Sequence, residues 1–387
     1  EDPTRRRERW GHARLARPPG PLVWIHAASL GESLAVLPVV ERLTRGPDAL
    51  HVLLTTVTRS SGELMAERLP PRAIHAYAPL DTAPAMTRFL AHWQPAATVV
   101  VEQELWPLLL ARSPAPRLLV NARLSARSAR RWQRWRPIAR WLLGRFALIL
   151  AQSRGDGERL RALGAAHVEM PGNLKTAAPP LPVDAAELAQ LRDAIGERPV
   201  WVAASTHEPE EAWVEAADRV LRARFPDLLT IIVPRHPARA EAISTRLARA
   251  DLGRRTTMPV PERATGIYLV DGFGELGLIY RVAMVAFVGG SLLPHGGQNP
   301  LEAVRLGCPV VFGPHMTNFR ELADALVDEG AARRVEPATL ADAVADWLGD
   351  DGRRARAADA GARLARALGD AALTRTTNAI RDAVERR

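Results

Sequence analysis

The stretch VAMVAFVGGSLLPHGGQNPLEAVRLGCPVVFG, residues 282–313, decides the fold of the second half of the chain. Its apolar start, Val282–Val288, predicts a buried parallel strand, and the run Pro309–Phe312 predicts a second one. Between them, Asn299 and Pro300 suit the start of a helix. A strand, a glycine-rich loop and a helix N-terminus predict an anion site, because backbone N–H groups and the helix dipole converge there. The same glycines also fit a loop that merely turns tightly.

Composition limits the class of protein. A chain of 387 residues with 47% hydrophobic residues is expected to be globular and to form two domains. The single cysteine, Cys308, excludes an intrachain disulfide and a cysteine metal cluster, which fits a reducing compartment. A formal charge of +9 predicts an anionic partner, either nucleic acid, a phospholipid surface or a phosphorylated substrate. No membrane span or signal peptide is visible.

Short apolar runs alternate with helical patterns along the whole chain, which predicts parallel sheets covered by helices on both faces. The predicted strands are Leu22–Ala27, His51–Val57, Ile74–Ala78, Ala97–Glu102, Arg117–Asn121, Phe146–Ala151, Val200–Ala204, Leu228–Val233, Ile267–Val270, Val282–Val288 and Pro309–Phe312. The predicted helices include Ser33–Thr44, Ala83–His92 and Ala126–Leu143. We therefore expect an α/β protein with two Rossmann-like domains facing across a cleft.

The proline-rich region 171–199 is the best domain boundary. We predict an N-terminal domain over residues 1–172 and a C-terminal domain over residues 173–387, and leave open that the last helix crosses back to the first domain. Neither half carries a dinucleotide-binding GxGxxG after its first strand, which speaks against a dehydrogenase.

Ligands of such sheets bind where the strands end, so polar residues there are candidate site residues. Glu32 follows the first strand, although a carboxylate in the first turn of a helix commonly serves only the helix dipole. Glu102 ends a very apolar strand, where an unbonded carboxylate is costly, and we therefore favour it over Glu104. In the second half, prolines on both sides of the dipeptide Arg235-His236 direct an arginine that could bind phosphate.

The histidines His207 and His236 do not show the paired spacing of a metal site, and we interpret both as polar loop residues. The segment Arg117–Arg145 combines many arginines with Trp132, Trp135 and Trp141 and contains almost no acidic residue. It fits a solvated helix with a tryptophan-lined core face. It also fits an anionic membrane surface or nucleic acid.

Ten short motifs occur in a fixed order along essentially the whole chain. They are Trp24–Ala27, Gly31–Glu32, Val101–Pro107, Asn121–Ser125, Gly172–Lys175, Ala204–Glu208, Pro234–Pro237, Gly274–Leu276, Gly289–Ser291 and Asn299–Glu302. Each motif is weak alone, but the ordered set resembles the 3-deoxy-D-manno-octulosonic acid (Kdo) transferases, which act in lipopolysaccharide biosynthesis. Two departures are Gln103, where the family usually has threonine, and the Thr-Ala pair that follows Lys175.

The resemblance implies a GT-B glycosyltransferase that inverts configuration and needs no metal or other cofactor. The implied donor is CMP-Kdo, and the implied acceptor is the lipid A precursor lipid IVA. By this analogy Glu32 is the general base, and Glu102 and Lys175 stabilise the transition state. The implied CMP contacts are Pro234, Arg235, Phe273, Gly274, Glu275, Asn299, Pro300, Leu301 and Glu302.

The family's N-terminal membrane anchor is not found in this sequence. We therefore expect a peripheral protein on the cytoplasmic face of the bacterial inner membrane, which contacts the anionic surface and binds no nucleic acid. Two alternatives stay open. One is a nucleic-acid-binding module that uses the arginine-rich segment, marked by salt-dependent binding to any duplex. The other is a sugar-nucleotide epimerase of the same architecture, which would not need that segment.

Overall fold

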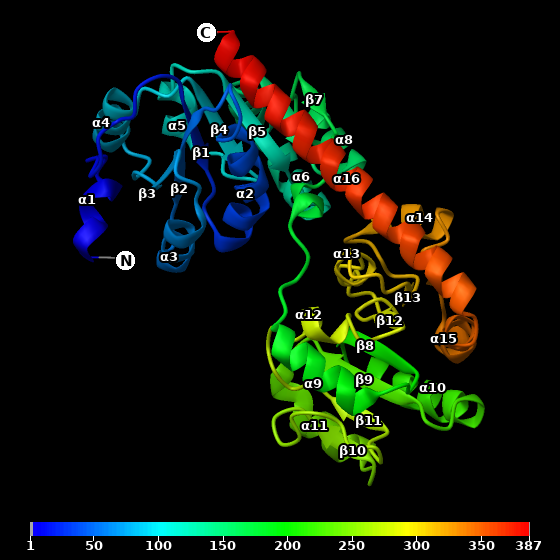
Figure 1. Ribbon diagram of the computed structural model, residues 1–387. Helices are drawn as coiled ribbons and strands as arrows, with labels where there is room; N and C mark the ends of the chain where they lie inside the picture. Colours follow the sequence, from blue (N-terminus) through cyan, green and yellow to red (C-terminus); the bar gives the residue numbers. More distant parts are fainter. Residues whose placement is uncertain (1–2, 387) are drawn as a thin grey trace. The chain divides into compact units, whose positions relative to one another are not determined.

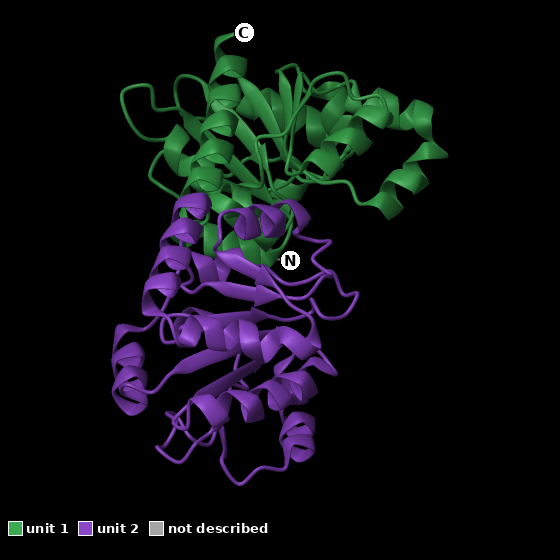
Figure 2. Ribbon diagram, turned by 90° about the vertical axis from the view of Figure 1, so that its right-hand side faces the viewer, with its two compact units in different colours: residues 1–178, 366–387 green, residues 179–365 purple. Residues whose placement is uncertain are grey.

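The computed structural model describes residues 3–386 and divides into two compact units. Unit 1 runs to Ala178 and resumes at Arg366, and unit 2 comprises Pro179–Ala365 (Figure 2). Each unit holds one seven-stranded sheet in which the strands are parallel. The α/β class with parallel sheets that the alternating apolar runs predicted is confirmed.

The sheet of unit 1 has the strand order β3-β2-β1-β4-β5-β6-β7 (Figure 1). Its strands are β1 (Leu22–His26), β2 (His51–Thr56), β3 (Ala73–Tyr77), β4 (Ala97–Val101), β5 (Arg117–Ala122), β6 (Leu148–Ala151) and β7 (Val168–Glu169). The sequence predicted the first six but missed β7, because two residues at a sheet edge leave no apolar run to recognise.

Side chains of successive strand residues point to opposite faces, so each sheet separates two cores. In β1, Leu22 and Trp24 belong to one core, and Val23 and Ile25 belong to the other. The helical segments of unit 1 before the last helix are η1 (Pro3–Arg5), α1 (Arg6–Arg9), α2 (Leu30–Leu43), α3 (Arg59–Arg68), α4 (Ala83–Trp93), α5 (Pro107–Arg112), α6 (Ala126–Gln133), α7 (Arg136–Leu143), α8 (Arg154–Ala162) and η2 (Leu174–Ala177).

The sheet of unit 2 has the strand order β10-β11-β9-β8-β12-β13-β14. Its strands are β8 (Val200–Thr206), β9 (Leu229–Pro234), β10 (Leu252–Arg254), β11 (Ile267–Leu269), β12 (Val285–Val288), β13 (Val310–Phe312) and β14 (Ala332–Arg334). The two edge strands, β10 and β14, escaped the sequence prediction. Each has three residues and contains arginine, so neither resembles a buried apolar strand.

Unit 2 also buries a core on each face of its sheet, with Val202 and Ala204 of β8 on one side and Trp201 and Ala203 on the other. Its helical segments before the last helix are α9 (Ala185–Ile195), α10 (Glu210–Arg224), η3 (Pro237–Arg239), α11 (Ala240–Leu247), α12 (Leu276–Ile279), α13 (Leu301–Val304), α14 (Arg320–Asp328), η4 (Pro337–Thr339) and α15 (Leu340–Leu348).

The last helix, α16 (Asp351–Glu385), belongs to unit 2 up to Ala365 and to unit 1 from Arg366 (Figure 1, red). In unit 1 its residues Ala372 and Ile380 are buried in the core that also contains α2. Arg375 forms an ion pair with Glu169, with 2.6 Å between Nε and Oε2. Burial and this ion pair together fix the end of the chain to unit 1.

The predicted helix Ala126–Leu143 is wrong as a single element. The structure has two helices, α6 and α7, which are separated by Arg134 and Trp135. Pro137 lies in the first turn of α7, where a missing N–H costs nothing. Inside one continuous helix, the same proline would remove a hydrogen bond and clash with the preceding turn. The proline therefore breaks the arginine-rich segment into two helices.

Candidate active site

The predicted catalytic residues lie at the carboxyl edge of the unit 1 sheet, beside β1 and β4. These strands are hydrogen-bonded neighbours, with His26 opposite Val100. β2 lies on one side of β1 and β4 on the other, so the strand order reverses here. Ligands of open parallel sheets bind at such reversals. Glu32 follows β1 and Glu102 follows β4, so both lie at this point of the edge.

Glu32 is half-buried in the first turn of α2, and its backbone N–H donates a hydrogen bond to Oγ of the N-cap residue Ser29 at 3.3 Å. Its Oε2 accepts a hydrogen bond from the backbone N–H of Ala28 at 2.7 Å, and its Oε1 accepts one from Ser29 Oγ at 3.0 Å. Burial raises the pKa of Glu32; these two hydrogen bonds lower it, and the nearby carboxylates of Glu104 and Glu102 raise it further. The net effect is a raised pKa, which suits a general base.

Glu102 is buried and carries a positive φ of 58°, an uncommon conformation for a residue with a side chain. Its Oε1 lies 2.8 Å from Nζ of Lys175, so the two form an ion pair. Such strain at the edge of a sheet is typical of functional sites. The structure therefore brings Glu32, Glu102 and Lys175, three residues from distant parts of the sequence, to one edge of unit 1.

Asn121, at the end of β5, connects the two partners of this ion pair. Its Oδ1 accepts a hydrogen bond from the backbone N–H of Leu174 at 2.9 Å, and its Nδ2 lies 3.5 Å from Glu102 Oε1. Leu174 is buried in the unit 1 core and directly precedes Lys175. The sequence-based boundary after residue 172 assigned Lys175 to the second half of the chain, but these contacts hold it in unit 1.

Three further residues at this edge received no role from the sequence: Glu104, Trp106 and His26. The indole Nε1 of Trp106 donates a hydrogen bond to Glu104 Oε2 at 2.7 Å. The ring of Trp106 meets the fully buried His26 edge-on, with 4.5 Å between centroids. Burial, and to a lesser extent the charge of Arg9, lowers the pKa of His26 to about 4, so its ring is neutral at pH 7. His26 lies in the motif Trp24–Ala27, and Glu104 and Trp106 lie in the motif Val101–Pro107. Membership of these motifs was the one sequence signal that could have pointed to the three residues.

The predicted CMP contacts lie in unit 2, at the corresponding edge of its sheet. β8 and β12 are neighbours there, with Ala204 opposite Val288, and β9 lies on the other side of β8. In each unit the strand order therefore reverses at the first strand of the sheet, which is β1 in unit 1 and β8 in unit 2. The glycine-rich loop after β12 lies at this reversal.

The glycine-rich loop does not offer the free N–H groups that the sequence predicted. The backbone N–H groups of Gly290, Ser291 and Leu292 all donate to the carboxylate of Glu210, at 2.7 to 3.1 Å. Glu210 begins α10 and is completely buried, so its charge requires such donors. The predicted anion site of the loop is therefore filled by the protein's own carboxylate.

The helix after this loop also differs from the prediction. α13 spans only Leu301–Val304, and Pro300 occupies its N-cap position. The side chain of Asn299 still serves the helix start, because its Oδ1 accepts a hydrogen bond from the backbone N–H of Leu301 at 3.1 Å. Four residues make a weak dipole, so an anion at this edge needs a side-chain cation as well.

Arg235 provides such a cation. It is exposed after β9, and within residues 3–386 its guanidinium has no hydrogen-bond partner. Burial raises the pKa of Glu302, whereas its hydrogen bond from Asn299 Nδ2 and the charge of Arg235 lower it. Arg235, which follows β9, and Glu302, which lies in α13, offer a charged donor and an acceptor in unit 2.

The remaining predicted contacts fall into exposed and buried groups. Phe273 is 87% exposed, so its ring is available for stacking on a base. Gly274 beside it has a positive φ of 82°. Glu275 pairs with Arg255 at 3.4 Å. Pro234, Pro300 and Leu301 are buried and shape the loops rather than present side chains to a ligand.

Three histidines gather at the same edge of unit 2. The ring of His207 lies with its centroid 4.9 Å from that of His295 and 6.0 Å from that of His236. No group of three or more histidine, cysteine or acidic side chains within residues 3–386 is arranged to hold a metal ion. The sequence noted His207 and His236 as loop residues, and the fold adds His295 from the glycine-rich loop.

Comparisons with known proteins identify the family of this chain. Residues 4–178 match the family model described as 3-deoxy-D-manno-octulosonic-acid transferase (kdotransferase). The chain is 38% identical to a probable mitochondrial 3-deoxy-D-manno-octulosonic acid transferase of Arabidopsis thaliana, over 82% of this chain and 74% of that protein. It is also 38% identical to the 3-deoxy-D-manno-octulosonic acid transferase of Bordetella pertussis, over 95% of this chain and 89% of that one. The chain belongs to the 3-deoxy-D-manno-octulosonic acid transferase family.

Kdo transferases are glycosyltransferases, as the sequence resemblance implied. A solved structure of a putative UDP-N-acetylglucosamine 2-epimerase from Listeria monocytogenes aligns with 95% of this chain and 97% of its own, at a TM-score of 0.62 and 16% identity. At that identity the likeness shows the fold alone. It supports the GT-B assignment of this Kdo transferase but does not favour epimerase chemistry.

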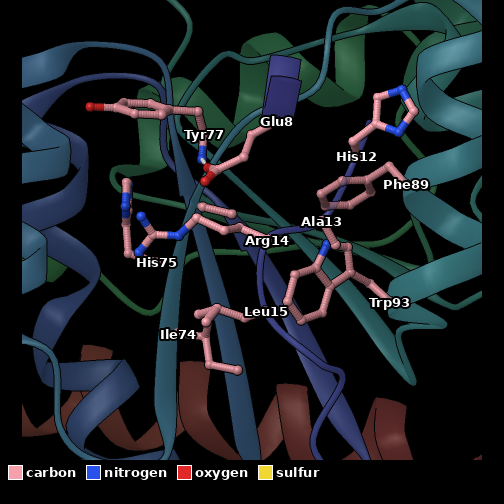
Figure 3. A pocket seen from close by; sticks show the side chains of 11 residues that line it. Glu8, His12, Ala13, Arg14, Leu15, Ile74, His75, Tyr77, Phe89 and Trp93 are labelled. Carbon is pink, nitrogen blue, oxygen red and sulfur yellow. Dashed lines mark hydrogen bonds between the residues drawn. The ribbon is translucent and has the colours of Figure 1, made fainter. Parts of the chain in front are cut away.

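A small hollow of this Kdo transferase, lined in part by its N-terminal segment, lies in unit 1 (Figure 3). Glu8 at its rim accepts a hydrogen bond from the backbone N–H of Tyr77 at 2.7 Å and pairs with Arg5 at 2.8 Å. The free volume is about 10 Å³, which holds about one water molecule. This hollow is too small for a sugar nucleotide, so we do not consider it a substrate site.

The arginine-rich segment of this Kdo transferase forms what we call the arginine–tryptophan surface. Its exposed residues are Arg123, Arg127, Arg130, Arg131, Arg134, Trp135, Arg136, Ile138, Arg140 and Trp141. No salt bridge within the described part of the chain involves these arginines. No helix in that part of the chain is long and apolar enough to cross a membrane.

Proposed function

We propose that this protein transfers Kdo from CMP-Kdo to the lipid A precursor lipid IVA, with inversion of configuration and without a metal ion. One observation carries the proposal: in a chain of this family, Glu32 stands with a raised pKa beside the ion pair of Glu102 and Lys175 at one edge of unit 1. An inverting sugar transfer uses a carboxylate that takes the proton of the acceptor hydroxyl. A neighbouring ion pair can stabilise the charges that develop on the sugar and on the leaving phosphate.

In this mechanism the acceptor hydroxyl loses its proton to Glu32 while its oxygen attacks the anomeric carbon of Kdo. The bond from that carbon to the CMP phosphate breaks, and its electron pair leaves with CMP. The carboxylate of Glu102 stabilises the positive charge that develops on the sugar, and the ammonium of Lys175 stabilises the departing phosphate. Unit 1 thus supplies the base and the two charges that stabilise the transition state.

Unit 2 binds the nucleotide. Arg235 is exposed and lacks a hydrogen-bond partner within residues 3–386, so it is available for the CMP phosphate. Glu302 accepts hydrogen bonds from ribose hydroxyls, and the exposed ring of Phe273 stacks on cytosine. Because arginine and lysine side chains compensate the phosphate charge, the reaction proceeds without a divalent cation.

Incubating the protein with CMP-Kdo and lipid IVA, followed by mass analysis of the lipid, tests the proposal. A gain in lipid mass equal to one or more Kdo residues is expected, with release of CMP. The same assay with EDTA tests the metal independence, and turnover is expected to be unchanged. A loss with EDTA that Mg²⁺ restores would contradict it. An unmodified lipid with consumed donor would contradict the acceptor assignment.

The acceptor is a phosphorylated lipid, so we place the protein at the anionic cytoplasmic surface of the inner membrane, with the arginine–tryptophan surface against it. Anionic lipids attract each nearby arginine by about 1 kcal/mol, and exposed tryptophan favours the interface. Trp135 and Trp141 are 60% and 44% exposed, unusual for a tryptophan without a partner surface.

Replacing Arg130, Arg131 and Arg134 with glutamine is expected to weaken binding to anionic vesicles by about 10- to 100-fold at low salt. Activity on the lipid acceptor should fall, whereas CMP affinity should not change. Co-sedimentation with vesicles measures the first effect, and high salt should release the unaltered protein.

The matched control replaces three exposed arginines elsewhere in unit 1. Arg45, Arg68 and Arg72 carry the same total charge but lie outside the arginine–tryptophan surface. Their replacement with glutamine should leave vesicle binding almost unchanged. Equal losses in the two triple variants, or equal binding to neutral and anionic vesicles, would show that this surface has no special role.

A further inference from the structure

Lys175 stands apart in the composition of the chain, because it is the only lysine among 52 lysines and arginines. Its ammonium is a compact point charge on a flexible stem, whereas a guanidinium is planar and larger. The side chain is 46% exposed, yet its Nζ lies 2.8 Å from Glu102 Oε1. Because ordering a lysine side chain costs conformational entropy, this contact depends on a backbone that is fixed in the right place.

The turn that carries Lys175 is η2, and two asparagines hold its start. Asn121 Oδ1 accepts a hydrogen bond from the backbone N–H of Leu174 at 2.9 Å. Asn173 Oδ1 accepts one from the backbone N–H of Lys175 at 2.9 Å, and the carbonyl of Asn173 accepts one from the N–H of Thr176 at 2.8 Å. These bonds fix the conformation of the turn up to Thr176.

The end of this turn lies against the last helix. A Cβ added to Gly369 of α16 would stand 2.5 Å from the carbonyl oxygen of Thr176 and 3.2 Å from Cα of Ala177. Non-bonded carbon and oxygen atoms normally stay about 3.3–3.6 Å apart, so a side chain at position 369 would force a shift of roughly 0.8 Å or more. Glycine is unfavourable inside a helix. The close approach of α16 to η2 therefore gives this glycine a structural reason.

The helix is anchored close to this contact, whereas the end of the turn lies nearer the surface. One turn after the glycine, Ala372 is buried in the core of unit 1. Arg375 pairs with Glu169, with 2.6 Å between Nε and Oε2. Thr176 and Ala177 are only half-buried. A methyl group at position 369 should therefore displace the turn without unfolding unit 1.

We propose that Gly369 is a positioning residue for Kdo transfer, because it lets α16 hold η2 where Lys175 reaches Glu102. The inference rests on the proposed role of Lys175 in stabilising the departing phosphate. The contacts run from the helix to the backbone of Thr176, and from Lys175 to Glu102, all within unit 1. A side chain at position 369 moves the turn, and with it the point from which the lysine side chain starts.

Because Lys175 is the only lysine, its amine can be followed without an assay of Kdo transfer. Treatment of the full chain with N-hydroxysuccinimidyl acetate acetylates this amine, and mass analysis of the peptides measures the rate. An amine attacks the reagent only after it leaves the ion pair and loses its proton. In Gly369→Ala we expect acetylation of Lys175 to be about two- to five-fold faster, as for a lost, partly exposed ion pair. Glu102→Gln removes the partner and sets the upper limit of this rate.

The matched control, Gly352→Ala, makes the same substitution in the same helix. A Cβ added there would lie 3.3 Å from Nη1 of Arg356 and 3.4 Å from Oδ1 of Asp350, which are the ends of side chains that can move aside. This variant should leave both the acetylation rate of Lys175 and the turnover unchanged. Thermal unfolding of each variant shows that it is folded.

Turnover on CMP-Kdo and lipid IVA is the second readout. Gly369→Ala should lower kcat by about 5- to 20-fold, because a small misplacement of a catalytic group is costly, and should leave CMP affinity unchanged. In a chain that already carries Lys175→Met, the same change at position 369 should have almost no further effect on kcat, since the ammonium that the turn positions is absent.

The outcomes separate this inference from the proposed function. Equal acetylation rates in Gly369→Ala and in the unaltered protein would overturn the inference, whatever the turnover. Faster acetylation with full turnover, together with full activity of Lys175→Met, would overturn the proposed role of Lys175 and leave only the contact. An equal loss of kcat from Gly369→Ala with and without the lysine would show that the glycine serves helix packing alone, and would reject the inference.

Discussion

Replacing Glu32 with glutamine is expected to lower turnover by about two to four orders of magnitude, the usual effect of losing a general base. Glutamine has nearly the same shape, and its amide oxygen can still accept the hydrogen bond that Ala28 donates to Glu32 at 2.7 Å. The change removes one favourable charge at the start of α2, which costs about 0.3–1 kcal/mol of stability. Turnover on CMP-Kdo and lipid IVA measures the effect.

The control for this prediction is the affinity for CMP. Glu32 lies in unit 1 and the proposed nucleotide contacts lie in unit 2, so the dissociation constant for CMP should not change in the variant. The matched variant Glu41→Gln alters a partly exposed carboxylate near the other end of α2, which pairs with Arg45, and should keep full turnover. Near-normal turnover of Glu32→Gln would remove Glu32 from the mechanism.

Replacing Arg235 with alanine is expected to weaken CMP binding by about 1.5–3 kcal/mol, the usual contribution of a hydrogen bond to a charged group. This corresponds to roughly a 10- to 150-fold higher dissociation constant. Because the guanidinium has no hydrogen-bond partner within residues 3–386 and its side chain is exposed, its loss breaks no internal hydrogen bond, and the free energy of unfolding should hardly change. Calorimetric titration with CMP and with cytidine measures the effect.

Cytidine lacks the phosphate and should bind more weakly than CMP. Its dissociation constant should be the same for the Arg235→Ala variant and for the unaltered protein. A second variant, Arg224→Ala, removes an exposed arginine at the end of α10 in the same unit and should not affect either ligand. If Arg235→Ala weakened CMP and cytidine equally, the arginine would not contact the phosphate. Unchanged CMP binding would remove it from the site.

Much of the fold could be predicted because parallel strands buried on both faces are continuous apolar runs. The strands between Leu22 and Phe312 that lie inside the sheets were found for this reason. β7, β10 and β14 were missed because they are short edge strands whose apolar content is low. The break at Trp135 was missed although Pro137 marks it, because the helical pattern of the segment was followed across a proline that suits only the first turn of a helix.

The sequence by itself determined the α/β class, the family and the identity of the residues at the strand ends, because apolar runs and short motifs are local properties of a chain. Only the tertiary structure decided which of these residues meet. Asn121 holds Lys175 near Glu102, Trp106 fixes Glu104, and the buried carboxylate of Glu210 takes the N–H groups of the glycine-rich loop.

Each of these contacts joins residues whose neighbourhood depends on the order of strands in the sheet or on a buried charge that must find donors. Neither the strand order nor the burial of a particular carboxylate can be calculated from the residues next to it in the chain. The motifs therefore identified the residue types at the carboxyl edges of the sheets. The arrangement of these residues depends on the packing of strands that are distant in sequence.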